Sequence, residues 1–182
     1  MSSSQMIRCS QSQPPEMLQN YQYMTDYKLL PDTSRVWIYQ AQAPLSPKNA
    51  QEIEAHLTKF ADTWVSHNNQ LQAFAKVYHH QFLVLMVDEN QAGASGCSID
   101  KSVHFMQQLE QHYKIVLFDR MTFTYKDGET IKSAPKQEFA ALYKAGTIDD
   151  TTLVFDNLIK TKKDFDTQWV KPLGTSWHKR MV

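Results

Sequence analysis

Apolar residues in the first half of the chain follow strand and helix periodicities in turn. Residues 35–41 (RVWIYQA) are rich in strand-forming side chains, and residues 71–77 alternate apolar with polar positions. Residues 82–87 (FLVLMV) are apolar throughout, which predicts a strand buried on both faces at the centre of a sheet. His79-His80, between the last two strands, predicts a tight hairpin turn.

Two further segments place apolar residues three or four positions apart, as one face of a helix does. The first starts at Ser46-Pro47, a capping residue followed by proline, and runs to Ser66. The second is followed by residues 116–125, which predict a fourth strand. The apolar positions are Ile53, Leu57, Phe60 and Trp64 in the first helix and Ile99, Val103, Met106, Leu109 and Tyr113 in the second.

Turn and capping signals divide the remainder of the chain. Asp127-Gly128 predicts a hairpin into a short strand at residues 130–132. Ser133-Ala134-Pro135 opens a helix that stops at Gly146, and residues 153–155 predict a short strand. Thr161 begins a capping box for a last helix, which ends at Pro172.

The order βαββαβ predicts an α+β fold with a ferredoxin-like core, an extra hairpin strand and a C-terminal helical appendage. In this layout residues 35–41 and 82–87 form the central strands, which we expect to be parallel neighbours. Residues 1–23 predict a disordered extension, because Ser and Gln dominate and apolar periodicity is absent. Residues 24–182 then form one domain, with a core at 35–132 and an appendage at 133–182 that covers the open sheet face.

Composition and charge exclude several classes of protein. The 182 residues carry 19 basic and 19 acidic side chains, so the net charge is zero and nucleic acid is not an expected partner. Cys9 and Cys97 cannot form a disulfide framework, which fits a reducing compartment. The longest apolar run has six residues, too few to span a membrane, so a cytoplasmic protein is expected. Homo-oligomerisation stays open.

The turn between the strand at 82–87 and the next helix carries the most suggestive chemistry. It reads GASGCSID, and Ser98 or Asp100 is expected to cap the helix. Free amides and the helix dipole favour an anion there, with Ser95 and Gly96 as further ligand-binding residues. If the two central strands are parallel, Gln40 and Asp88 at their carboxyl ends face the same crevice. A non-enzymatic module that binds a small anion or a protein partner is therefore predicted.

An alternative is a thiol-dependent enzyme. Lys101 and His104 follow Cys97 at helical spacing, and a thiolate beside these groups is a plausible nucleophile. Capping, tight turning and packing also account for each of these residues. The histidines show no metal-ligand spacing, so no metal or other cofactor is expected.

The segments SRVWIYQ, FLVLMVDE and SGCSID, together with Trp177, resemble a family of short bacterial proteins of unknown function. The family carries the automatic label "ABC transporter ATPase". The resemblance runs from about Leu30 to Trp177 and implies that residues before about Met24 are extra to the domain. None of the five glycines begins a G-x-x-x-x-G-K-[ST] loop, the motif that holds nucleotide phosphates, so ATP hydrolysis is not expected.

Overall fold

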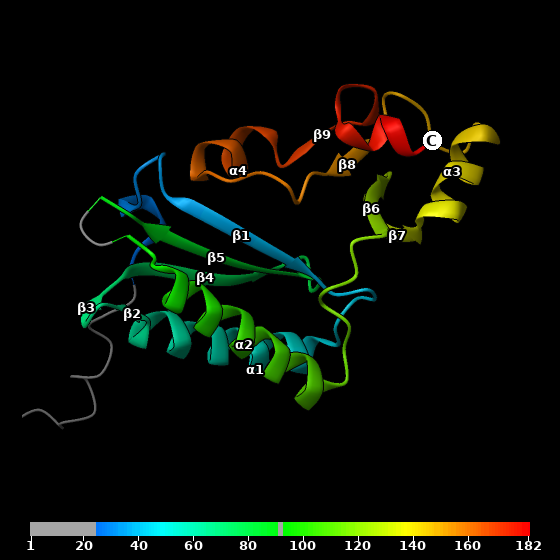
Figure 1. The fold of residues 1–182 in the computed structure, drawn as a ribbon. Coiled ribbons are helices and arrows are strands. Elements are labelled where there is room, and N and C mark those ends of the chain that lie inside the picture. Colours follow the sequence, from blue (N-terminus) through cyan, green and yellow to red (C-terminus); the bar gives the residue numbers. More distant parts are fainter. Residues whose placement is uncertain (1–24, 91–92) are drawn as a thin grey trace, which may run out of the picture.

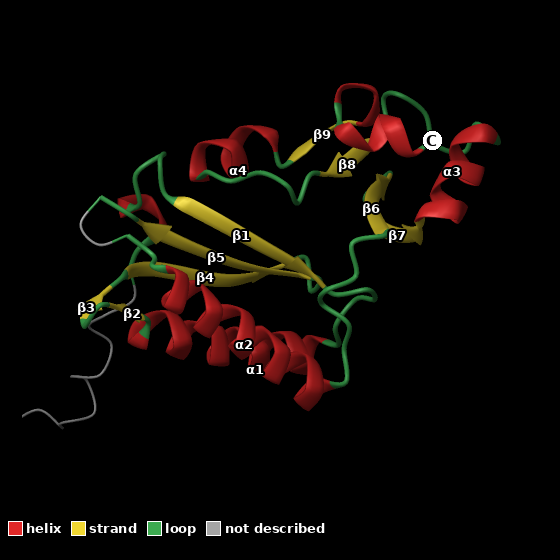
Figure 2. Ribbon diagram, in the orientation of Figure 1, coloured by secondary structure: helices red, strands yellow, loops and turns green. Residues whose placement is uncertain are grey.

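A computed structural model describes residues 25–90 and 93–182, so the extension predicted for residues 1–23 lies outside the described residues. The first half of the chain forms a three-stranded sheet. Figure 1 shows long helices along one face of this sheet and the C-terminal part of the chain on the other side. Figure 2 shows the same mixture of helices and strands, and the predicted α+β class is confirmed. Within the described ranges, no helix is both long and apolar enough to cross a bilayer.

The first sheet has the order β1-β5-β4, and its strands are β1 (Arg35–Gln40), β4 (Gln72–Tyr78) and β5 (Phe82–Asp88). All seven residues of β5 are buried, which confirms the prediction of a central strand covered on both faces. The turn between β4 and β5 has positive φ at His79 and His80, and this confirms the predicted tight hairpin.

Two helices cover one face of this sheet, α1 (Pro47–Thr63) and α2 (Gly96–Tyr113). Ser46 caps α1 by accepting from the Asn49 amide, as its sequence signal predicts. Ile53 and Leu57 of α1 are completely buried against the helix-facing side of the sheet. A short hairpin, β2 (Val65–Ser66) and β3 (Asn69–Gln70), follows α1.

The second half of the chain builds another sheet, in the order β7-β6-β8-β9. Its strands are β6 (Thr122–Asp127), β7 (Thr130–Pro135), β8 (Leu153–Phe155) and β9 (Val170–Pro172). The remaining elements are α3 (Lys136–Lys144), α4 (Lys162–Gln168) and the 3₁₀ turns η2 (Tyr27–Leu29), η3 (Leu173–Thr175) and η4 (Trp177–Met181).

The C-terminal elements cover the face of the first sheet that α1 and α2 leave open. Phe155, Phe165 and Trp169 pack with Phe82 and Val84 of the central strand. The Phe165 and Trp169 rings are stacked 4.5 Å apart, and Thr161 caps α4 as predicted. The central strand β5 is therefore buried between two layers, the helices α1 and α2 on one face and the C-terminal elements on the other.

The ferredoxin-like arrangement is not confirmed, because β6 lies in the second sheet and not beside β1. The expected parallel pairing of the two central strands is also wrong, since β1 and β5 are antiparallel. The helix α1 returns the chain so that β1 and β4 run the same way, and the tight turn then reverses β5 against both. The helix predicted from residue 133 begins at Lys136, after β7.

Candidate functional site

The turn before α2 is organised by Ser95. Ser95, not Ser98 or Asp100, is the N-cap, and its Oγ accepts the Ser98 amide proton at 3.3 Å. Ser98 is buried, its Oγ donates to the Ser95 carbonyl, and its own carbonyl accepts from Trp64 Nε1 at 2.9 Å. Gly96 and Asp100 are exposed in the first turn of the helix. The two serines therefore close the turn internally.

Other amides of this turn are also paired. The Ala94 amide donates to a carboxylate oxygen of Glu89, and the Ser95 amide donates to Ser66 Oγ, both at 3.2 Å. The nearby carboxylates of Glu89 and Asp100 are unfavourable neighbours for an anion. The turn thus offers fewer free donors to an anion than its sequence indicates.

Gln40 and Asp88 do not lie close together, because two antiparallel strands have their carboxyl ends at opposite ends of the sheet. Gln40 pairs in register with Phe82, the first residue of β5, whereas Asp88 is the last. Asp88 is buried and accepts the Asn90 amide proton at 2.9 Å. The predicted ligand set is therefore divided, with Gln40 at one end of the sheet and the other members at the opposite end.

The alternative site around Cys97 is brought together on the outer surface. Cys97 is exposed and lines a shallow hollow with Lys101, His104, Phe60 and Phe105. His104 Nε2 lies 3.2 Å from Gln108 Nε2. No hydrogen bond or ion pair within the described residues joins Cys97 to Lys101 or His104. The three side chains share a surface without forming an assembled catalytic set.

A deeper groove of about 640 Å³ lies where the two sheets approach each other along β1. We call this the β1 groove. Trp37, Tyr39 and Val103 line one side, and Phe155, Leu158 and Trp177 line the other. Phe118 and Leu158 are large apolar side chains that remain 36% and 63% exposed at its walls. Such exposed apolar surface in a concave site is typical of a ligand-binding region.

The floor of the β1 groove is a stretch of strand edge that no described part of the chain pairs with. Val36 donates its outward amide to the Lys160 carbonyl at 2.9 Å, and Gln42 donates its own to Val116 at 3.0 Å. Main-chain groups alternate in direction along a strand, so those of Ile38 and Gln40 point outward as well. In the described parts of the chain neither residue has a main-chain hydrogen bond on that side. Both residues line the groove.

Gln40 joins the segments that form one end of the groove. Its side chain is buried, and its Nε2 donates to the Thr122 carbonyl at 3.1 Å. Its Oε1 accepts from Asn157 Nδ2 at 2.8 Å, and Asn157 in turn accepts from Trp169 Nε1. Gln40 is therefore a fixed wall residue whose side-chain amide is already satisfied.

Arg120 supplies a positive charge to the groove. It is exposed, lines the groove, and has no carboxylate within ion-pair distance among the residues that the structure describes. The neighbouring Asp119 is occupied by Thr122, the Met121 amide and Gln42. These bonds hold the pKa of the Asp119 carboxyl below its usual range. The Arg120 guanidinium is thus left available to an anionic group.

Asp156 and His178 support the wall opposite the helices. The buried Asp156 carboxylate pairs with Lys171 Nζ at 2.6 Å and accepts from Trp177 Nε1 and the Leu158 amide. His178 is buried, and its Nδ1 lies 2.8 Å from Ser176 Oγ. Burial lowers the pKa of His178 to about 4, so its imidazole is neutral near pH 7.

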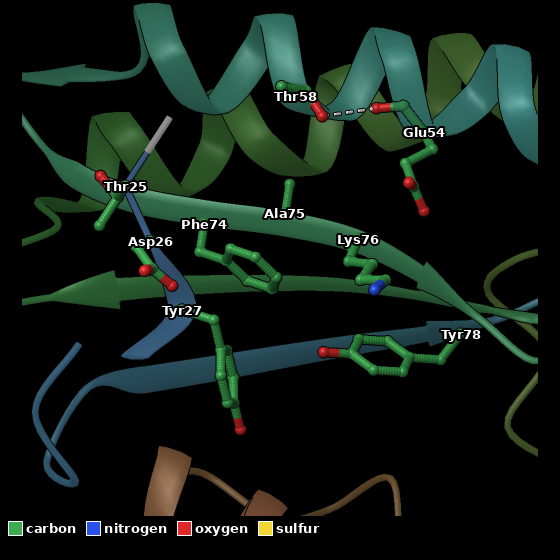
Figure 3. Close-up of a pocket in the computed structure, with 9 residues that line it drawn as sticks. All are labelled: Thr25, Asp26, Tyr27, Glu54, Thr58, Phe74, Ala75, Lys76 and Tyr78. Atoms are coloured by element: carbon green, nitrogen blue, oxygen red, sulfur yellow. Dashed lines mark hydrogen bonds between the residues drawn. The ribbon is translucent and has the colours of Figure 1, made fainter. Parts of the chain in front are cut away.

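A second hollow, of about 450 Å³, lies beside β4 (Figure 3). Tyr27, Phe74 and Tyr78 present their rings to it, and Glu54 approaches from α1. A Glu54 carboxylate oxygen accepts the outward amide proton of Val77 at 2.9 Å. This edge of the sheet is therefore partly closed by a side chain, in contrast to β1 at Ile38 and Gln40.

Sequence reasoning named Gln40 but missed the rest of the groove. Its walls come from segments such as 117–123, 155–158 and 177–178, and no local pattern relates these segments to β1. The one local signal is the polar Gln40 near the end of the strand segment RVWIYQA. Over the described ranges, no group of three or more His, Cys, Asp or Glu side chains is arranged to hold a metal ion.

The comparisons with known proteins add no family to this geometry. No family model matches the chain, and neither a curated protein nor a solved structure is significantly similar to it. The case for a function therefore depends on the β1 groove itself.

Proposed function

We propose that this chain is a non-enzymatic binding module, and that its site is the β1 groove and not the turn before α2. The observation that supports this most strongly is Arg120, a cation that no carboxylate of the described residues pairs with, on a groove with aromatic and aliphatic walls. A ligand with an apolar body and one anionic group fits such a site, because each part finds its complement. The absence of a phosphate-binding loop favours this function over ATP hydrolysis.

Anilinonaphthalene sulfonate tests the proposal, since it combines aromatic rings with an anion. We expect a saturable rise in its fluorescence with one site per chain. Arg120→Gln and Leu158→Glu should each weaken binding about tenfold, the first by removing the cation and the second by placing a carboxylate in the wall. The measurement is a fluorescence titration of the folded full-length chain.

Leu29→Glu is the matched control, because Leu29 is 77% exposed and lies outside the groove. Its dye affinity should equal that of the unmodified protein. Equal affinity in all three variants, or no saturable binding at all, would remove the groove as the site.

A thiol-dependent reaction is a second candidate, supported by the exposure of Cys97 beside Lys101 and His104. Iodoacetamide labelling in a Cys9→Ser background measures the reactivity of Cys97 alone. If Lys101 and His104 activate the thiol, Lys101→Gln and His104→Gln should slow labelling severalfold near neutral pH. Unchanged rates in both variants would eliminate this candidate.

A further inference from the structure

The stretch of β1 edge left open by residues 25–90 and 93–182 has the dimensions of a short strand. The outward amides of Val36 and Gln42 donate to Lys160 and Val116, and the outward groups of Ile38 and Gln40 lie between them. Six residue steps span about 20 Å in a strand. The opening therefore accepts about three residues of an extended chain, and the bonded ends prevent a longer pairing.

Main-chain groups at such an edge recognise main-chain groups. Ile38 and Gln40 each present one N–H and one C=O, so an added strand can form up to four hydrogen bonds. A small aromatic anion cannot satisfy this alternating set of donors and acceptors. An extended peptide can, because every second residue turns its main-chain N–H and C=O toward β1. From this edge we propose that the β1 groove binds an extended, apolar segment of a partner protein, paired antiparallel to β1. The inference rests on the groove being the binding site, as proposed above.

The two walls of the groove determine which side chains of the peptide fit. Residues opposite Ile38 and Gln40 direct their side chains to the wall with Phe155 and Leu158, and the residue between them faces Tyr39 and Phe118. The wall side chains named at these positions are apolar, so three consecutive apolar residues fit.

The position of Arg120 indicates where an acidic residue of the bound peptide should lie. Arg120 belongs to the segment that contacts β1 at its carboxyl end, where Thr122 accepts from Gln40 and Asp119 from Gln42. In antiparallel pairing the peptide enters at this end. An acidic residue two positions before the first of the three apolar residues therefore lies near Arg120.

The test uses fluorescein-labelled, amidated hexapeptides of the form DG-x-z-x-S, with valine, isoleucine, phenylalanine or tyrosine at x and z. Fluorescence polarisation with the full chain measures binding. The best peptide is then N-methylated at both x residues, whose amides face β1, or at z, whose amide points away. Loss of two main-chain bonds should weaken binding about twentyfold, whereas methylation at z should leave it within about twofold.

A charge swap tests the flanking contact. The peptide should weaken when lysine replaces its aspartate, and Arg120→Glu should restore the affinity of the lysine peptide. If dye binding depends on Arg120 and Leu158 but no hexapeptide binds, the peptide inference is wrong and the groove remains a small-ligand site. Equal effects of methylation at x and z would equally overturn strand pairing. Loss of both dye and peptide binding would overturn the groove itself.

Discussion

Replacement of Asp156 by Ala is expected to lower the free energy of unfolding by about 3–5 kcal/mol. Asp156 is 6% exposed, and it is the common partner of Lys171, Trp177 Nε1 and the Leu158 amide. Its removal leaves the Lys171 ammonium, whose side chain is 20% exposed, without its carboxylate. It also frees Trp177 and Leu158, so the groove wall should loosen as stability falls.

Asp127→Ala is the matched control for Asp156→Ala. Asp127 also pairs with a lysine, Lys132, but both side chains are more than half exposed. An exposed pair contributes less than about 1 kcal/mol, because water solvates both partners after the pair is broken. Urea denaturation followed by tryptophan fluorescence compares the two variants. Equal losses of stability would mean that Asp156 does not hold the wall.

Acidification should destabilise the protein through His178. Burial is the main reason that its pKa in the folded chain is about 4, against 6.5 for the free side chain, while Asp156 raises the pKa and Lys171 lowers it to smaller extents. Between these values the unfolded chain binds a proton that the folded chain does not. The stability that His178 contributes is therefore complete above pH 6.5 and falls as the pH decreases toward 4.

The buried, neutral His178 should make the free energy of unfolding fall by about 2 kcal/mol between neutral pH and about pH 5. The His178→Gln variant has no titrating group at this position. Its free energy of unfolding should therefore fall by about 2 kcal/mol less than that of the unmodified protein over the same pH range. His79, whose pKa is also lowered by burial, is present in both proteins and cancels in the comparison. Urea unfolding of the two proteins at matched pH values measures the difference. Parallel pH profiles would show that the protonation of His178 does not limit stability.

The first sheet follows closely from local sequence patterns. A continuous apolar run can be buried only with cover on both faces, which is why β5 was placed correctly at the centre. The faces of α1 and α2 follow from the spacing of residues such as Ile53 and Met106, both completely buried. The tight turn at His79-His80, where both residues adopt positive φ, is likewise predicted from its place between two strand patterns.

The predicted strand at 116–125 shows where local patterns mislead. Its first half is an apolar run followed by two charged residues (VLFDR), and Val116 and Met121, which are 44% and 50% exposed, lie outside the strands of the structure. Ladder pairing begins only at Thr122, where β7 lies alongside. The apolar residues Leu117 and Phe118 line the β1 groove and do not join a sheet, and only the packing of distant segments distinguishes the two.

The candidate site depends on the same long-range packing. Gln40 reaches Thr122 and Asn157, which are 82 and 117 residues away in the sequence. The relative direction of the strands also matters, because the expected parallel pairing of β1 and β5 would place Gln40 beside the turn before α2. With antiparallel pairing Gln40 instead contacts Thr122 of the second sheet and lines the same groove as Arg120.

Residue-resolved amide hydrogen exchange, with and without the best hexapeptide, tests the open edge of β1 most directly. In the free protein the Ile38 and Gln40 amides should exchange quickly, while Trp37 and Tyr39, which face β5, and Val36, which is bonded to Lys160, exchange slowly. Added peptide should slow exchange at Ile38 and Gln40 selectively. Ile38 and Gln40 amides that are as protected as Tyr39 in the free protein, or that stay fast with peptide bound, would contradict the account.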